Sequence, residues 1–503
     1  MNYFKLLLTT IIGICISQII ATFHVYLANL QLANQIQYLH ANGYLIVPNL
    51  HVLPHLQSLN TAFVGGLFFS GTIGLGIISI TLFVSWFWVN ITQKSKLFLL
   101  IILSQWIIAI YFANKNGWSV FTLYLCIMLP LLTGIHAIIP AKRKPSPRYS
   151  TLFWSFPIIF MIIAGYSTGR SISFLSIRDY LLLSNKTGSY LNELYYRYTL
   201  YPGEIIKPFA LKQQKTCYIQ TDINNAKRYI KGVQRKCIRY DYLVVPDKEK
   251  ADVVLKIDPP NIFFQLNDKT VLHTSIMDYL RETKKVFLDF SSQTDVNNFF
   301  RMCILLSLVV SAPILIYILM MQGLFVLVCL TRIPTFLGQC LVVGMMCIWI
   351  GQMILQIPPD FSKKATQNEW HNAFHTAYQQ LDWRQAVVLL KSHHFSITRE
   401  DHQLALKWLK QTDFPVLKYW LIRFLSGATI STDKDIFLNF LTDPNMNVVC
   451  QALYASGKQR DRKQISLIKD FIQNNPNWYA QMYAYRALKR LGWRNYPQLE
   501  RNR

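Results

Sequence analysis

The apolar first third of the chain carries few side chains able to do acid–base or ion-coupled chemistry. Residues 1–169 contain no Asp or Glu, and the first acid is Asp179. Ionisable groups are costly inside a bilayer and mark proton or ion pathways when they occur there. The polar candidates in the apolar runs are His24, His136, Gln18, Gln105, Gln339 and Gln352. Since a cation-coupled carrier ordinarily uses a carboxylate, the sequence disfavours secondary transport and predicts interfacial positions for His24 and His136.

Histidine pairs are the second candidate chemistry. His51 and His55 are four residues apart, a spacing that places two imidazoles on one helix face as a metal pair. Pro54 lies between them, and no Cys or carboxylate of residues 29–60 joins them. His393 and its neighbour His394 are adjacent and would point apart on a helix. We therefore predict polar loop residues at a headgroup surface, with no metal and no cofactor.

Cys217 and Cys237 are the only cysteines of residues 170–300. Each lies beside a predicted strand, and a helix joins the two strands. An extracytoplasmic compartment would permit a disulfide between them. The alternative is two separate buried thiols. The chain contains no Cys-x-x-Cys motif, which excludes the usual zinc-ribbon and redox motifs.

A basic run without acids lies between Ile223 and Tyr240. Its candidate anion-binding residues are Lys227, Arg228, Lys231, Arg235 and Lys236. Three of them recur at helical spacing and would share one face. A run of this kind is either an anion-binding face or an ordinary solvated surface. The formal charge of +25 favours contact with an anionic lipid, glycan or protein.

Gly66, Ser70 and Gly74 form a ridge of small residues four apart. Such a ridge lets a second helix approach closely inside a membrane. We predict that it packs within the helix bundle, and a homodimer seam is the alternative.

Long apolar runs place most of these residues in a membrane. Apolar residues make up 52% of the 503-residue chain and charged residues only 15%. We expect a transmembrane bundle at 1–169 and two further spans at 302–357, about seven spans in all. The predicted spans are 4–28, 61–89, 97–113, 118–139, 151–169, 302–330 and 335–357.

Positive charge in short links marks the cytoplasmic side of a membrane. Links 90–96 and 141–150 carry Lys and Arg, whereas residues 29–60 carry none. The N-terminus is therefore predicted inside, and the segments after the fifth and seventh spans outside. The expected location is a bacterial inner membrane.

Residues 170–300 are predicted to form a small extracytoplasmic α+β domain. Alternation of apolar residues indicates strands, and a hairpin is expected to turn at Asn267-Asp268. The predicted strands are 215–221, 237–245, 252–258 and 286–290, the hairpin is 262–274, and the helices are 223–236 and 275–284.

Residues 358–503 are predicted to be helical throughout. Turn residues recur at spacings of about 30 residues, which is typical of a helical-pair solenoid. The segments LTDPNMNVVCQALYASGKQ and LIKDFIQNNPNWYAQMYAYRALKRLG resemble HEAT repeats over residues 412–493, although Cys450 follows Val449 where that family usually carries Arg in its second helix. The resemblance implies an all-α solenoid that binds a partner protein, with Trp478 and Tyr479 as candidate contacts.

These patterns favour a membrane-anchored interaction or assembly subunit over an enzyme. The alternative is a transport or channel component whose soluble domains gate the bundle. A membrane-bound transferase or hydrolase ranks third, because no phosphate-binding, zinc-protease or serine-hydrolase motif occurs and residues 29–60 lack the acid that lipid-linked-sugar transferases typically use. The expected partners are membrane lipid and a protein, and not nucleic acid.

Overall fold

A computed structural model describes residues 3–128, 130–132, 175, 178–221, 227–308, 366–428 and 435–497. The predicted spans 151–169 and 335–357 lie outside these residues. Spans 118–139 and 302–330 are described only as far as residues 132 and 308. Within the described ranges, three helices are long and apolar enough to cross a membrane, Leu8–Ala41, Leu59–Ser85 and Lys96–Ala113. Over its described residues the structure therefore shows three candidate spans of the seven that we expected.

Helix α1 (Tyr3–Ala41) leaves the apolar region without a break. Its 39 residues extend about 58 Å at the usual helical rise. The exposed side of the helix changes from mostly apolar to polar part-way along. Its exposed residues are first Ile11, Cys15, Ile19, Phe23 and Leu27, and then Gln31, Asn34, Gln37 and His40. The change fits a membrane boundary between Leu27 and Gln31, close to the predicted end of the first span. Residues 29–41, which we expected in a link, continue the helix.

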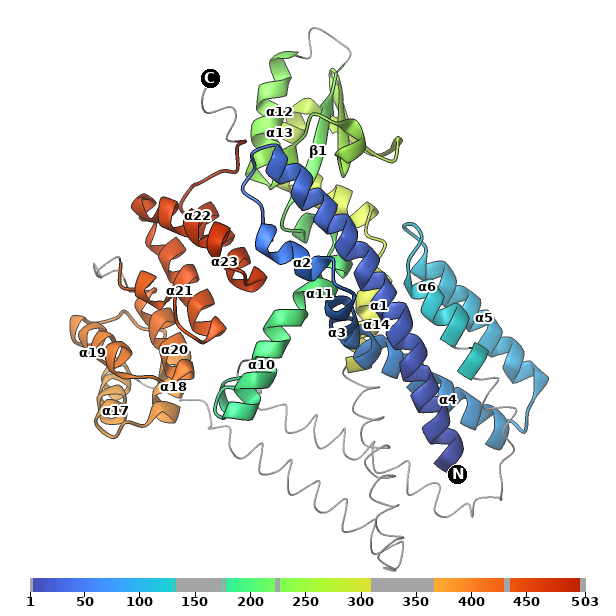
Figure 1. The fold of residues 1–503 in the computed structure, drawn as a ribbon, viewed down its shortest axis with the longest axis horizontal. Helices are drawn as coiled ribbons and strands as arrows, with labels where there is room; N and C mark the ends of the chain where they lie inside the picture. Colours follow the sequence, from blue (N-terminus) through green and yellow to red (C-terminus); the bar gives the residue numbers. More distant parts are fainter. Residues whose placement is uncertain are drawn as a thin grey trace, which may run out of the picture.

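Some of the remaining helices of the membrane part pack directly on α1, whereas α5 and α6 lie farther from it (Figure 1). A continuous helical segment returns along it, formed by α3 (Leu59–Phe69), the π-turn η2 (Ser70–Gly74) and α4 (Leu75–Asn90). Helix α5 (Lys96–Ala113) follows, then α6 (Phe121–Leu123) and the π-turn η3 (Tyr124–Met128), and later α14 (Asn298–Leu306). The large apolar side chains of α5 are widely exposed, as expected for a helix that faces lipid.

The α/β part is built on one mixed five-stranded sheet. Its strands are β1 (Lys215–Gln220), β2 (Tyr242–Val244), β3 (Val253–Asp258), β4 (Asn261–Leu266) and β5 (Lys269–Ser275). They lie in the order β2-β1-β3-β4-β5. Strand β1 is parallel to both of its neighbours, β2 and β3. Strand β4 is antiparallel to both of its neighbours, β3 and β5. The predicted hairpin is confirmed, and Asn267 and Asp268 both have positive φ in its turn.

One predicted strand of this part is wrong, and another begins later than we expected. Residues 286–290 belong to α13 (Ile276–Gln293), and Cys237 belongs to α12 (Lys227–Arg239), so that the strand predicted at 237–245 begins only at Tyr242. In α13 the buried side chains recur at intervals of three and four residues, and they include Tyr279, Thr283, Val286, Phe287 and Phe290. The backbone is kinked at Glu282, close to residue 284 where we expected the helix to end, and the helical period continues beyond the kink.

The C-terminal helical part is all-α over its described residues. It contains α17 (Gln367–Gln379), α18 (Trp383–Ser392), α19 (Arg399–Gln411), α20 (Pro415–Leu425), α21 (Met446–Gln459), α22 (Ile465–Asn474) and α23 (Trp478–Arg490). Residues 435–441, which we expected to be helical like the rest of this region, contain only the 3-10 turn η9 (Leu438–Phe440). Close packing of α21 on α23 requires Gly457, because a Cβ there would lie 2.8 Å from Ala487 Cα.

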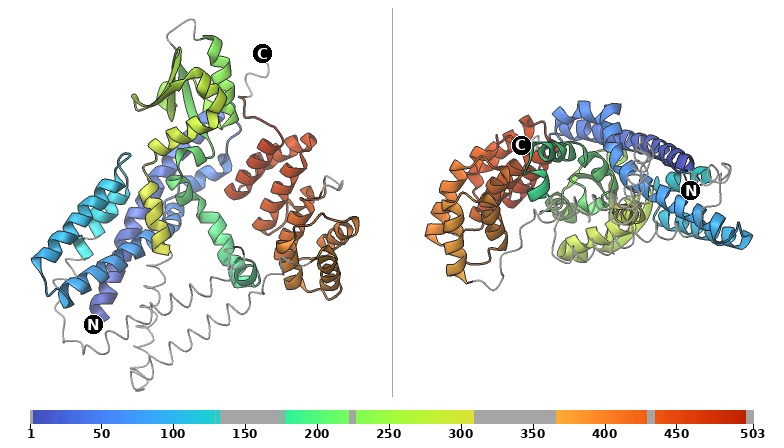
Figure 2. Two further views of the ribbon diagram at one scale, coloured as in Figure 1. Left: turned by 180° about the vertical axis from the view of Figure 1, so that it is seen from behind. Right: turned by 90° about the horizontal axis from the view of Figure 1, so that it is seen from below.

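Further elements connect the three parts or, like η7 (Lys248–Lys250) and η10 (Arg462–Gln464), lie within one of them (Figures 1 and 2). The others are η1 (Leu50–Val52), α2 (Leu53–Leu56), η4 (Arg178–Leu182), α10 (Lys186–Tyr198), α11 (Leu200–Ile206) and η5 (Phe209–Leu211). Helices α10 and α11 lie between the helical part and the membrane part, and the α/β part sits at the far end of α1. The loop that follows α1 is therefore placed to contact all three parts.

Candidate functional site

Asn49, in the loop after α1, binds the end of a distant helix. Its Nδ2 donates to the carbonyl oxygens of Ile472 at 2.7 Å, Gln473 at 3.0 Å and Asn475 at 3.1 Å. Its backbone N–H donates to Gln481 Oε1 at 2.8 Å. The last carbonyls of a helix have no partner within the helix. One buried side chain from the first part of the chain thus supplies a donor at the C-terminal end of α22.

Amide side chains hold a second stretch of the same loop. The Leu45 backbone donates to Asn495 Oδ1 at 3.0 Å and accepts from Asn495 Nδ2 at 2.7 Å. Gln214 Nε2, just before β1, donates to the Leu45 carbonyl at 2.7 Å, and Gln214 Oε1 accepts from Val47 N at 3.1 Å. The loop is therefore fixed to the helical part and to the α/β part by hydrogen bonds that satisfy its buried backbone groups.

Asp241 joins the α/β part directly to α23. Its Oδ1 accepts from Lys489 Nζ at 2.7 Å and from the Tyr485 hydroxyl at 3.0 Å. Burial, and then the nearby Asp241 carboxylate, raise the pKa of Tyr485 well above its ordinary value, so this hydroxyl is a neutral donor. Asp241 has φ +63°, a left-handed conformation that Asp tolerates better than most residues.

The predicted partner contacts Trp478 and Tyr479 lie in an internal interface. The Trp478 ring packs on Tyr201 of α11 with a centroid separation of 5.4 Å, and the Tyr479 ring packs on Tyr196 of α10 at 4.5 Å. Trp478 is only 5% exposed. Helical periodicity identified an apolar face but could not reveal that the chain's own α10 and α11 cover it. Trp478 is therefore not available to another protein in this structure, and Tyr479 is only partly exposed.

Asp179, the first acid of the chain, belongs to η4, just before α10. Its side chain is completely buried against the helical part. Its carboxylate lies 2.7 Å from Arg178 Nη2 and 2.9 Å from Lys391 Nζ, and it accepts from Trp420 Nε1 at 2.8 Å. The Arg178 guanidinium also lies over the Tyr419 ring, 4.1 Å from its centroid. Two cations and an indole thus neutralise and orient one buried carboxylate.

The two cysteines of the α/β part come together as free thiols, which was the alternative to a disulfide. Both are fully buried, Cys217 on β1 and Cys237 on α12, and they are in hydrogen-bonding contact. Burial, followed by this contact, raises the pKa of Cys217 well above its ordinary value. Cys237 Sγ also lies 3.3 Å from the Tyr279 hydroxyl. The helix places Cys237 over the sheet, which the wrongly predicted strand could not indicate.

The basic run lies on α12, with Lys227 as its first residue. Arg228, Lys231 and Arg235 are exposed and Lys236 is half-buried. None of these four makes an ion pair with another described residue. They therefore form an open cationic face on the side of α12 that points away from the sheet.

The small-residue ridge packs against α1. A Cβ on Gly66 would lie 3.1 Å from the Thr22 backbone nitrogen, and Ser70 Oγ donates to Gln18 Oε1 at 2.5 Å. His24 stacks on Phe69 at 5.7 Å, so it is an inner residue of the bundle and not the interfacial one we expected. His136 lies outside the described residues. His51 in η1 and His55 in α2 are both exposed.

The Gly74→Ala variant is expected to lower the thermal stability of the purified protein in detergent. A Cβ at this position would lie 2.3 Å from Ser17 Oγ and 2.7 Å from Ser17 Cβ, which forces the two helices apart. Overpacking of this kind costs about 1–3 kcal/mol. Gly71→Ala is the matched control, because nothing lies within 4 Å of its Cβ. Equal melting temperatures for the two variants would contradict the close approach.

No protein-family model, curated protein or solved structure matches this chain. The geometry therefore carries the functional argument by itself. A cleft at the junction, lined in part by Leu32, Pro48, Glu204 and Trp478, has room for about one water molecule. Among the described residues, one group of side chains has the donor types of a metal site, His371, His375 and Asp401.

Proposed function

We propose that the protein is a membrane-anchored interaction or assembly subunit, in which the α/β part and the helical part together present one surface to a partner protein. The observation that carries this proposal is the direct docking of the two parts on each other and on the loop after α1. Asn49, Asp241 and Leu45 each make side-chain or backbone hydrogen bonds across these boundaries. Contacts of this kind suit a single assembled platform better than parts tethered by flexible linkers.

We further propose that the chain crosses a bacterial inner membrane seven times and that this platform is extracytoplasmic. Two observations support this sidedness. The end of α1 contacts the α/β part, with Gln35 Nε2 2.9 Å from Asp252 Oδ2, and so does the turn after α5, with Asn116 Nδ2 3.1 Å from the Asp295 carbonyl. Link 90–96, at the opposite ends of α4 and α5, carries Lys94 and Lys96 and would face the cytoplasm.

Single cysteines test this topology. In intact cells, a membrane-impermeant maleimide is expected to label Lys284→Cys of α13 and Lys410→Cys of α19, both exposed positions. Lys96→Cys, at the start of α5, is expected to react only after permeabilisation. The parent chain gives the background from the native cysteines. Labelling of residues 284 and 410 from opposite sides of the membrane would refute the shared platform.

The partner contact is expected to use exposed charge, since Trp478 is covered and Tyr479 is only partly exposed. Two faces offer it, Lys231 and Arg235 on α12, and Lys407 and Lys410 on α19. We expect the double reversal Lys407→Glu/Lys410→Glu to reduce cross-linked partner recovered with the solubilised chain at least tenfold, because like charges across an interface repel. The charge-matched reversal Lys231→Glu/Arg235→Glu is the control. Loss in the control alone would move the contact to α12, and full recovery with both variants would contradict the proposal.

Transport remains the second hypothesis. The observation that favours it is a stripe of buried polar atoms on α1, Thr10 Oγ1, Ser17 Oγ and His24 Nδ1, seven residues apart, which have no hydrogen-bond partner among the described side chains and backbone. Unsatisfied polar groups inside a membrane often mark a water or ion path. We rank this hypothesis second because Gly66 and Gly74 bring α3 and η2 into direct contact with the same helix.

A further inference from the structure

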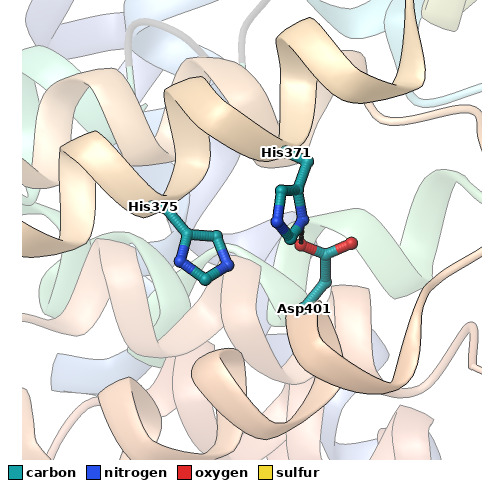
Figure 3. A group of neighbouring side chains, drawn as sticks. All are labelled: His371, His375 and Asp401. Atoms are coloured by element: carbon teal, nitrogen blue, oxygen red, sulfur yellow. Dashed lines mark hydrogen bonds and ion pairs between the residues drawn. The ribbon is translucent and has the colours of Figure 1, made fainter.

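Three potential metal ligands meet where α17 packs near α19 in the helical part (Figure 3). His371 and His375 are four residues apart on α17, and their ring centroids are 4.3 Å apart. Asp401 belongs to the first turn of α19. One ligand atom from each of the three side chains lies within 4.8 Å of the other two. Both imidazoles and the carboxylate thus converge on one small volume between the two helices.

The Asp401 carboxylate is held in place before any ligand arrives. Its side chain is 2% exposed, and Oδ2 accepts from the Thr398 hydroxyl at 2.6 Å. Its backbone N–H in turn donates to Thr398 Oγ1, the N-cap of α19. Oδ1 lies 2.7 Å from His371 Nδ1. A carboxylate fixed in this way is a preorganised oxygen ligand, and its position does not depend on a flexible side chain.

An ion pair does not explain the environment of His375. A simple pairing of His371 with Asp401 accounts for those two side chains. His375 Nε2, however, is buried and has no hydrogen-bond partner among the described residues, although the ring faces His371. A buried nitrogen left without a partner destabilises the fold. A cation between the three side chains would supply the missing partner.

We propose that His371, His375 and Asp401 bind one divalent transition-metal ion of the zinc class. Two imidazole nitrogens and one carboxylate oxygen are ligands that Zn²⁺ accepts, with bonds of about 2.0–2.2 Å. If His371 Nδ1 and Asp401 Oδ1 both bind the ion, their 2.7 Å hydrogen-bond contact must open slightly, and the wider separations of up to 4.8 Å must close. His371 is 26% exposed, so a fourth position is open to water or to Glu400, whose Oε2 lies 3.8 Å from His371 Nε2. The ion would cross-link α17 to α19 at the start of the helical part.

The test uses the full-length protein in detergent, freed of metal and titrated with Co²⁺ as a visible probe and Zn²⁺ as its competitor. We expect one equivalent of Co²⁺ to bind with the absorption of a low-symmetry site, and Zn²⁺ to displace it. His375→Gln, His371→Gln and Asp401→Asn should each weaken binding by more than the roughly 10- to 100-fold typical of losing an outer-shell partner. His394→Gln, at an exposed position, is the matched control and should bind as the parent does.

Two further readouts separate metal binding from folding. His375→Cys retains a ligand atom and should restore Co²⁺ binding with a new sulfur charge-transfer band, which a merely structural histidine would not produce. Chelator should lower the melting temperature of the parent to that of His375→Gln and should leave the variant unchanged. A parent chain that binds no Co²⁺ at millimolar concentration, or a folded His375→Gln that binds it equally, would overturn the proposal.

Discussion

The Asp179→Ala variant is expected to lose about 3–5 kcal/mol of stability in the helical part, since removal of one partner leaves a buried charge uncompensated. In this case two cations, Arg178 and Lys391, would remain without their carboxylate, and Trp420 Nε1 would lose its acceptor. Denaturant unfolding monitored by tryptophan fluorescence measures the loss. Limited proteolysis should show cleavage near α18 at protease concentrations that leave the parent intact.

Asp413→Ala is the matched control for this variant. Asp413 is fully exposed and lies 3.8 Å from Lys418, so its removal should change stability by less than about 0.5 kcal/mol. The double variant Asp179→Ala/Lys391→Met should recover part of the loss, because it removes one of the uncompensated charges. If Asp179→Ala unfolds together with Asp413→Ala, the buried cluster does not hold the two segments together.

The Asn49→Ala variant is expected to release α22 and α23 from the loop after α1. It removes the donor to three carbonyl oxygens and the acceptor for the His51 backbone N–H, at a cost of roughly 1–3 kcal/mol for each buried group left unsatisfied. Hydrogen–deuterium exchange should show faster exchange in residues 465–490, with the exchange of β3 and β4 unchanged.

Asn474→Ala provides the comparison for this experiment. Asn474 is the last residue of α22, the helix whose end Asn49 contacts, and it is exposed. Its substitution therefore changes the helix end without altering the contacts of Asn49. Exchange in α22 should then match that of the parent chain. Equal protection in Asn49→Ala and Asn474→Ala would show that the loop does not hold the helical part.

Local patterns predicted the elements whose residues alternate or recur regularly. Strand β3 follows the predicted alternation of Val253, Leu255 and Ile257, and the hairpin between β4 and β5 turns at the predicted Asn267-Asp268. The strand predicted at 286–290 was wrong because a short apolar run fits either period. The continuation of α13 depends on packing against the sheet, and local composition does not specify such packing.

The candidate sites were harder to predict, because their partners lie far apart in the sequence. Asn49 contacts residues more than 420 positions away, and Asp179 contacts Trp420 from 241 positions away. The sequence identified Asp179 as the first acid but gave no reason to expect two cations around it. His371 and His375 have the same four-residue spacing as His51 and His55, and only the fold brings a carboxylate to the first pair.

The unbroken course of α1 has a mechanical consequence. From Leu27, near the expected edge of the hydrocarbon, to Leu39 the helix extends about 18 Å as a stiff rod that ends at the α/β part. A change of about 10° in the inclination of its lipid-embedded half, as bilayer thinning or stretching produces, would swing the far end by about 3 Å. The contacts that Gln35 and Tyr38 make with Asp252 and Asp247 would experience that displacement first. Membrane tension would thus reach the sheet without any flexible joint to absorb it.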